Sequence, residues 1–200
     1  MWRRYKICCY QQPLAEILGI QSVPLDGAAE VLPLAEAPVV IQRISEPPRL
    51  ELLHWGLVPW WSQDQRSAMS LLTAPLDLAG ALPEIRPALQ ARRCLVPAVA
   101  GSWNGADATP ALPQPDAPSQ TMLAGVWECW RPQGAKAPYG SYCIFTEAPG
   151  ATDLPAPLVV EQKHWQAWLD LRTPVQHLHK LAVQAAQTPP VGAPTFEMAA

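Results

Sequence analysis

Hydrophobic and polar residues alternate in short segments before residue 60. In RLELLHWGLVP, Leu50 and Leu52 flank Glu51, which is the period of a strand with one buried face. A second strand-like run, APVVIQRI, precedes it and contains the apolar residues from Val39 to Ile44. The prolines of EPPR between the two runs are typical of a turn. The pattern therefore predicts a β-hairpin built from these two runs.

Further short apolar runs follow, separated by proline and glycine: CLVPAVAG, TMLAGVWECW, GSYCIFTEA and PLVV. Each has the length and composition of a strand, and the segment LPEIRPALQARR before the first of them reads as a broken helix. We expect an α+β fold, with mainly antiparallel sheets around one core and a few short helices. Trp55, Leu123 and Trp127 are expected to point into that core.

Three segments have helical spacing. LAEILGI predicts a short helix that ends at Gly19, and EQKHWQAWLDL predicts a second helix near the C-terminal end. A third helix is expected from Thr173 as its capping residue and Pro174 at its first position. The apolar positions on these helix faces are Leu14, Ile17 and Leu18, then Trp165, Trp168 and Leu169, then Val175, Leu178 and Ala182.

The composition fits one domain. A chain of 200 residues with 49% hydrophobic residues can build a full core, and we expect a single domain over residues 1–187. The 24 prolines favour short elements over long helices. Residues 105–120 are predicted to form a Pro-rich loop, and residues 188–200 a flexible Pro-rich tail.

The charge pattern excludes some classes of partner. The net charge of −3 gives no large basic field, so any nucleic-acid site must be a local patch. No stretch approaches the roughly 18 apolar residues that span a membrane, and the N-terminus lacks the apolar segment of a signal peptide. We expect a cytoplasmic protein without a membrane partner.

The cysteines and histidines do not form a metal motif. No CxxC pair occurs, and His177 and His179 are two positions apart, which places them on different faces of a helix. We expect no metal and no cofactor. Reduced, buried thiols are the favoured interpretation of the five cysteines, Cys8, Cys9, Cys94, Cys129 and Cys143.

The segment HWGLVPWW has two interpretations. Trp55, Trp60 and Trp61 could all pack in the core, or some could form an exposed aromatic wedge that stacks on bases. The order of the landmarks WGLVPWW, RRCLVPA, AGVWECW, CIFTEA and WQAWLD is more informative. Together with the LAEILGI helix, this order resembles the SRAP family, the SOS response-associated peptidases, over about residues 1 to 170.

The resemblance implies a specific chemistry. In that family a cysteine follows the initiator Met, and loss of Met leaves its amine free beside its thiol. The pair closes a thiazolidine with the aldehyde of an abasic site in single-stranded DNA, which gives a DNA–protein crosslink. A glutamate, a histidine, and an asparagine with a nearby arginine supply proton transfer, sugar orientation and phosphate contact.

This chain departs from the family at the positions that carry the chemistry. Trp2 stands at the cysteine and Arg3 at the following glycine, so the nucleophile is missing, and a bulky second residue should also prevent removal of Met1. The NARAET segment of the family falls on TAPLDL. The aligned residues are Thr73 at the asparagine, Pro75 at the arginine, Asp77 at a glutamate, Ser102 or Trp103 at the acid/base glutamate, and Asp153 at the histidine.

Cys8 and Cys9 are the alternative nucleophiles. An internal cysteine has an amide nitrogen in place of an amine, so it could form a hemithioacetal but no thiazolidine. Self-cleavage before either residue would create a new N-terminal cysteine, although the short distance to Leu14 argues against it. Buried structural thiols are the favoured interpretation.

Three functions follow from these observations. The first is a catalytically degenerate SRAP protein that keeps weak single-stranded DNA binding. The second is an interaction module that uses the same groove for a protein partner, and the third is an active enzyme with a rearranged site. Arginines near the start could contact phosphate or form a solvated edge. The DNA-binding candidates are Arg3, Arg4, Trp61 and Thr146.

Overall fold

The computed structural model describes residues 4–7, 11–21, 29–99, 121–132, 134–135, 137–148 and 155–184. Several sequence predictions fall outside these ranges. They are the predictions for Trp2, Arg3, Cys8, Cys9, Ser102, Trp103 and Asp153, for the loop over residues 105–120 and for the tail over residues 188–200.

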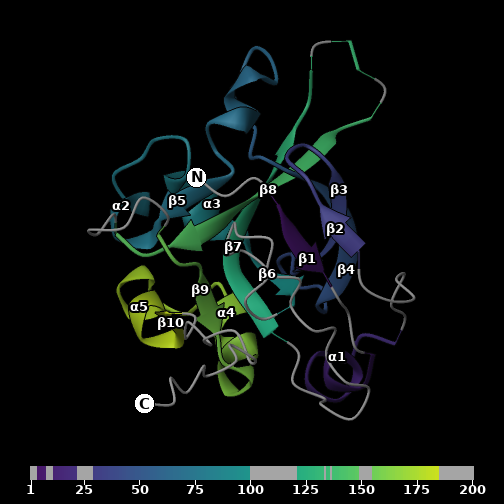
Figure 1. Cartoon of the computed structure of the whole chain (residues 1–200), viewed down its shortest axis with the longest axis vertical. Helices are drawn as coiled ribbons and strands as arrows, with labels where there is room; N and C mark the ends of the chain where they lie inside the picture. The colour runs from purple at the N-terminus through teal and green to yellow at the C-terminus, as the bar shows by residue number, and fades with distance from the viewer. Residues whose placement is uncertain are drawn as a thin grey trace, which may run out of the picture.

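Short strands and short helices alternate along the described chain (Figure 1). The strands are β1 (Tyr5–Ile7), β2 (Ala29–Val31), β3 (Glu36–Ile41), β4 (Arg49–Trp55), β5 (Thr73–Pro75), β6 (Arg93–Ala98), β7 (Thr121–Trp130), β8 (Tyr139–Thr146), β9 (Leu158–Val160) and β10 (Ala182–Gln184). The α-helices are α1 (Gln11–Leu18), α2 (Leu76–Ala79), α3 (Arg86–Ala91), α4 (Trp165–Leu169) and α5 (Leu178–Leu181), and the 3₁₀ turns are η1 (Arg66–Met69), η2 (Gln162–His164) and η3 (Val175–His177).

The predicted hairpin is present as β3 and β4. The two strands pair antiparallel from Glu36 opposite His54 to Ile41 opposite Arg49. β3 also pairs with β6, and β6 pairs with β7 in antiparallel register. The fold prediction of a sheet-dominated α+β structure with few short helices is confirmed.

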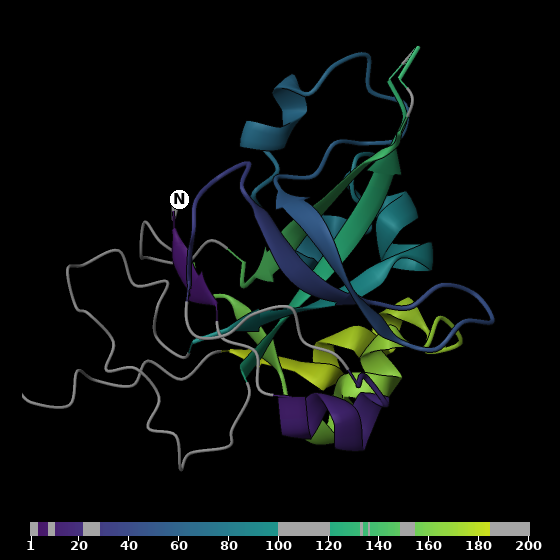
Figure 2. The same cartoon turned by 90° about the vertical axis from the view of Figure 1, so that its right-hand side faces the viewer.

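Five strands close into a ring. Along the ring β7 pairs with β6, β6 with β3, β3 with β4, β4 with β8, and β8 again with β7. Closure leaves none of these five strands as a long open edge, which removes a site for edge-to-edge aggregation. Figures 1 and 2 show the strands crossing at steep angles around this centre, with α1 and α4 at one end of the molecule.

The main core has the residues that the sequence predicted. Trp55 and Leu123 have no exposed surface and Trp127 is 5% exposed. Three fully buried indoles also satisfy their N–H groups on backbone carbonyls, because a buried donor without a partner would destabilise the fold. These bonds, each of 2.9 Å, run from Trp55 to Leu72, from Trp165 to Val160 and from Trp168 to Cys94.

The first two predicted helices are present. α1 ends where Gly19 takes a positive φ of 71°, and the Gly19 N–H donates to the Ala15 carbonyl at 3.0 Å. α4 buries Trp165, Trp168 and Leu169, as the spacing predicted. None of the helices in the described part of the chain is long and apolar enough to cross a membrane.

The third predicted helix was wrong in its bounds. Pro174 takes the capping position with an extended ψ of 141°, a 3₁₀ turn follows it, and α5 begins only at Leu178. Ala182, which the spacing placed on the helix, starts β10 and pairs with Val160 of β9. The reason is tertiary, because β9 offers an unpaired edge that only the folded sheet creates.

The parallel pairings were not predicted. β8 pairs in parallel with β4 through Ser141 and Tyr142, and with β5 through Ile144 to Thr146. Parallel pairs join segments that are far apart in the chain, so no turn motif in the sequence predicts which strands pair.

Gly56 offers a test of this packing. Its φ is +123°, and a Cβ there would lie 2.6 Å from the carbonyl oxygen of Ala68. We expect Gly56→Ala to lower the free energy of unfolding by about 2 kcal/mol or more in urea titrations, because it combines backbone strain with a clash against backbone. Gly80→Ala is the matched control, since Gly80 has a φ of −70° and nothing within 4 Å of the added atom. Equal losses for the two variants would contradict the prediction.

Candidate functional site

The candidate site lies on the connection between β4 and β5, two strands that both pair with β8. Trp55, the last residue of β4, is opposite Tyr142, and Thr73, the first residue of β5, is opposite Ile144. Residues 56–72 between them therefore form a loop whose two ends are held at positions two residues apart on β8. We call residues 56–72 the tryptophan loop.

Backbone bonds tie the start of the tryptophan loop to β8. The Gly56 N–H donates to the Tyr142 carbonyl at 2.9 Å, and the Val58 N–H donates to the Ser141 hydroxyl oxygen at 2.9 Å. Ser141 is fully buried, so its side chain is a fixed acceptor rather than a solvated group. The loop thus has a defined exit from the sheet despite its length.

The three tryptophans of HWGLVPWW divide between the two interpretations. Trp55 lies in the core, whereas Trp60 is 59% exposed and Trp61 is 50% exposed. Met69, on η1 of the same loop, is 48% exposed. Large apolar side chains in such a group are a feature of binding surfaces. In Figures 1 and 2 the blue segment of this loop projects at the end of the molecule opposite α1.

The described family positions lie on β5, α2 and β8. Thr73 and Pro75 are on β5, and Pro75 is opposite Thr146 of β8 in parallel register. Because side chains two apart on a strand share a face, Thr73, Pro75 and Thr146 lie on one face of this strand pair. The structure brings these predicted positions together, while the remaining ones lie outside the described residues.

The groups at these positions have their own partners. Thr146 is 1% exposed, and its hydroxyl donates to the Glu147 carbonyl at 3.0 Å. The carboxylate of Asp77, at the start of α2, lies 3.2 Å from the Nδ1 atom of His179 on α5. The pairing of Asp77 with His179 joins segments about a hundred residues apart and had no signal in the sequence. A contact between Thr146 and DNA stays a prediction.

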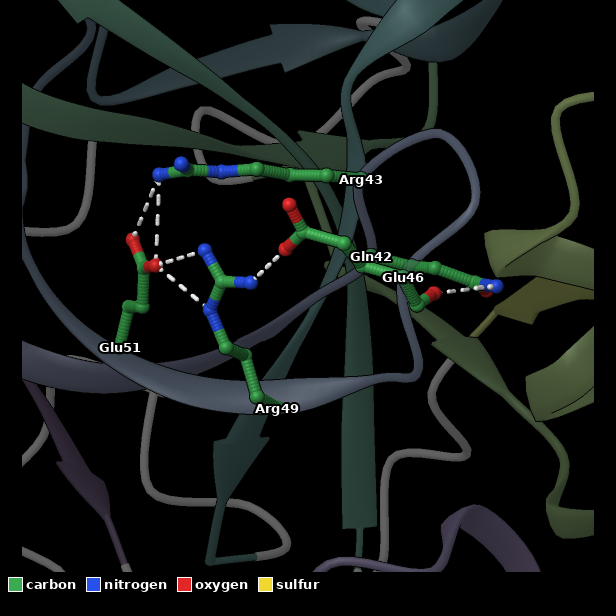
Figure 3. A network of polar contacts seen from close by, with 5 residues as sticks. All are labelled: Gln42, Arg43, Glu46, Arg49 and Glu51. Atoms are coloured by element: carbon green, nitrogen blue, oxygen red, sulfur yellow. Dashed lines mark hydrogen bonds and ion pairs between the residues drawn. The ribbon is translucent and has the colours of Figure 1, made fainter.

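Most cations that the structure describes lie beside carboxylates. Figure 3 shows the clearest case, in which Arg43 and Arg49 share the carboxylate of Glu51 at the β3–β4 turn, and Arg49 also pairs with Glu46. These bonds hold the pKa of Arg49 above its usual value, with Glu51 as the largest cause. Other described pairs are Arg4–Glu30 at 3.8 Å, Arg66–Asp64 at 2.9 Å, Arg92–Glu128 at 2.7 Å, Lys163–Glu161 at 2.6 Å and Arg172–Asp170 at 2.8 Å.

The described cysteines differ in exposure. Cys94 and Cys143 are fully buried, and burial raises the pKa of both thiols well above the ordinary value. Such thiols stay protonated and are poor nucleophiles. The prediction that all cysteines are buried was wrong for Cys129, which is exposed. Cys129 lies near the end of β7, where its neighbours Glu128 and Trp130 face inward and the alternation turns its side chain outward.

Sequence reasoning missed the residues that support the tryptophan loop. Ser141 accepts a loop N–H, and Trp130 of β7 packs beneath the loop with Val58 and Ala68 in a small cluster apart from the main core. The only local signal was the second tryptophan of AGVWECW, which by itself does not indicate a partner. Within the described ranges, no group of three His, Cys, Asp or Glu side chains is placed to hold a metal ion.

A family model decides the relationship of this chain. The model of the SOS response associated peptidase family, SRAP, matches residues 2–193. The chain belongs to the SRAP family. The resemblance inferred from the ordered landmarks is thereby confirmed.

Curated relatives of this SRAP chain carry a common description. It is similar to the abasic site processing protein YoqW of Bacillus subtilis, with 30% identity over 43% of this chain and 41% of the relative. It is also similar to the abasic site processing protein YoaM of Bacillus subtilis, with 26% identity over 61% of this chain and 57% of the relative. The aligned parts span less than two thirds of these relatives.

Solved structures share the SRAP-like fold of this chain. A protein from Bacteroides thetaiotaomicron superposes with a TM-score of 0.68 at 18% identity, over 89% of this chain and 85% of the other. A protein from Bordetella bronchiseptica superposes with a TM-score of 0.66 at 14% identity, over 90% of this chain and 93% of the other. At these identities the likeness concerns the fold alone.

The difference in thiol burial gives a direct test. We expect a maleimide reagent to label Cys129 in the native protein within minutes and to leave Cys94 and Cys143 unlabelled until denaturant is added, since reaction needs an accessible thiolate. Peptide mapping by mass spectrometry distinguishes the three sites from one another. Native labelling of Cys94 or Cys143 at the rate of Cys129 would show that the core around β6 and β8 opens readily.

Proposed function

We propose that this SRAP protein binds single-stranded DNA weakly and without covalent chemistry, through the tryptophan loop. The observation that carries the proposal is the pair Trp60 and Trp61, adjacent and at least half exposed on a loop that is tied to β8. The description of the curated relatives as abasic site processing proteins supports DNA as the ligand. A cytoplasmic location fits this function and stays a proposal with it.

Stacking is the main attractive force in this proposal. An indole that stacks on a base contributes about 1–3 kcal/mol and tolerates any base, because every base has an aromatic face. Phosphate contacts contribute less here, since the described arginines near the start and at the loop, Arg4 and Arg66, already lie beside Glu30 and Asp64. Arg3 and Arg4 remain the predicted phosphate contacts. The expected binding is therefore weak and only slightly salt-dependent.

The absence of covalent chemistry is proposed from the residue types. Trp2 stands where the family has its cysteine and carries no thiol. Thr73 and Pro75 stand at the asparagine and arginine positions, and a proline side chain has no donor for a phosphate. The thiols of Cys94 and Cys143 are buried with raised pKa values and cannot replace the nucleophile.

A protein partner is the second candidate. Asp64 and Arg66, the two charged residues of the tryptophan loop, form an ion pair of 2.9 Å, so the loop that exposes Trp60 and Trp61 carries no net charge. Aromatic, uncharged patches of this kind are also typical of protein interfaces. DNA is preferred here because the family relationship supports it, and binding measurements distinguish the two.

Fluorescence anisotropy with a labelled single-stranded oligonucleotide tests the binding proposal. We expect a dissociation constant in the micromolar range and a shallow dependence on salt. Trp61→Ala should weaken binding by about tenfold, because it removes one stacking platform worth at least 1 kcal/mol. Ile44→Ala, which truncates an exposed apolar side chain at the β3–β4 turn outside the tryptophan loop, is the control and should have a small effect. Nanomolar affinity at physiological salt, or no binding at all, would contradict the proposal.

Intact-protein mass spectrometry tests the covalent part. After incubation with abasic single-stranded DNA we expect no heat-stable adduct of the wild-type protein. The double variant Trp2→Cys with Arg3→Gly recreates the amine–thiol pair, and we expect slow crosslinking at most, since Thr73 and Pro75 do not restore orientation. A wild-type adduct, above all one mapped to a new N-terminus at Cys8 or Cys9, would instead support self-processing and an active enzyme.

A further inference from the structure

The exposed tryptophans occupy the centre of a tight turn. The Ser62 N–H donates to the Pro59 carbonyl at 2.9 Å, which is the hydrogen bond of a β-turn whose two central residues are Trp60 and Trp61. Central turn residues point their side chains away from the chain that enters and leaves the turn. The turn therefore explains why two adjacent indoles are both exposed.

The last residue of this turn, Ser62, is bonded to a side chain from the five-stranded ring. The indole N–H of Trp130, at the end of β7, donates to the Ser62 carbonyl at 2.6 Å. Ser62 directly follows Trp61, and its hydroxyl donates to the Asp64 carbonyl at 2.7 Å, which orders the next residues as well. The backbone beside Trp61 is thus held by a bond whose donor comes from the five-stranded ring.

Trp130 is itself immobilised by its surroundings. It is 5% exposed and lies in the small cluster with Val58 and Ala68, both of which are fully buried. Tyr139 of β8 packs edge-on against its ring, with centroids 6.2 Å apart and planes at 82°. Tyr139 is stacked in turn on His54 of β4, with centroids 4.1 Å apart. Three neighbours therefore hold the Trp130 ring, Val58 and Ala68 from the base of the tryptophan loop and Tyr139 from β8. A donor held in this way can fix the position of the carbonyl that it contacts.

We infer that Trp130 is the positioning residue of the binding site, and that its bond to Ser62 sets Trp60 and Trp61 in the orientation that stacks on bases. The inference rests on the proposed DNA binding and assigns a role within it. Trp130 does not touch DNA in this arrangement. It removes the need to order the turn on binding, and that ordering would otherwise weaken the affinity.

Trp130→Phe isolates this role, because it keeps an aromatic ring in the small cluster and deletes only the N–H donor and the second ring. We expect its affinity for a single-stranded oligonucleotide to fall by about fivefold, the size expected when one more group must be ordered on binding. The salt dependence should equal that of the wild type, since no phosphate contact is lost. Amide hydrogen exchange should speed up over residues 60–66.

Trp165→Phe is the matched control. It removes the same kind of bond, from a fully buried indole N–H to the Val160 carbonyl at 2.9 Å, but in the main core, where Trp165 of α4 contacts β9. A purely structural role for Trp130 predicts that both variants lower the melting temperature and the DNA affinity in proportion. The positioning role predicts that only Trp130→Phe lowers the DNA affinity and speeds amide hydrogen exchange over residues 60–66, whatever the melting temperatures of the two variants are.

The outcomes separate the inference from the function on which it rests. Wild-type binding that Trp61→Ala weakens about tenfold, with Trp130→Phe and Trp165→Phe binding as tightly as the wild type, would overturn the inference alone. If the wild type does not bind single-stranded DNA, the proposed function fails and with it the role in stacking. Should Trp130→Phe not fold, Ser141→Ala removes the acceptor of the Val58 N–H, which ties the loop to β8 four residues before Ser62, and the same loss of affinity is expected. Unchanged affinity in that variant would count against positioning.

Discussion

The shared edge of β8 is the constraint on which the rest of this structure depends. One edge of β8 pairs with β7, while the other is occupied first by β4 and then by β5. The first pairing closes the ring of five strands, and the second fixes where the tryptophan loop must return. Because the two ends of that loop are bonded to Tyr142 and Ile144, two positions apart on a buried strand, the sheet fixes where the surface loop begins and ends.

The same residue type serves three different purposes in this fold. Trp55, Trp165 and Trp168 fill the core, and their indole N–H groups donate to backbone carbonyls. Trp130 uses the same bond to hold a turn rather than a core strand, and Trp60 and Trp61 face solvent. The indole suits all three environments because it combines a large apolar ring with one directional donor.

Charge and thiol chemistry set the limits of the proposed function. More than half of the described arginines and lysines lie beside carboxylates, as Figure 3 shows at the β3–β4 turn, and this weakens their attraction for a polyanion. Burial keeps the thiols of Cys94 and Cys143 protonated. Among the residues that the structure describes, the exposed indoles of Trp60 and Trp61 favour stacking as the means of binding.

The sequence by itself determined the family, the main antiparallel strands, the first two predicted helices and part of the core. Periodicity identified the β3–β4 hairpin, the buried face of α4 and the buried Trp55 and Trp127, because local patterns report directly which side chains avoid water. Only the tertiary structure decided the parallel pairings of β8, the strand at Ala182, and which tryptophans of HWGLVPWW are exposed. Those features depend on contacts between distant segments, such as Trp130 with Ser62, and no local pattern encodes a partner that lies 68 positions away.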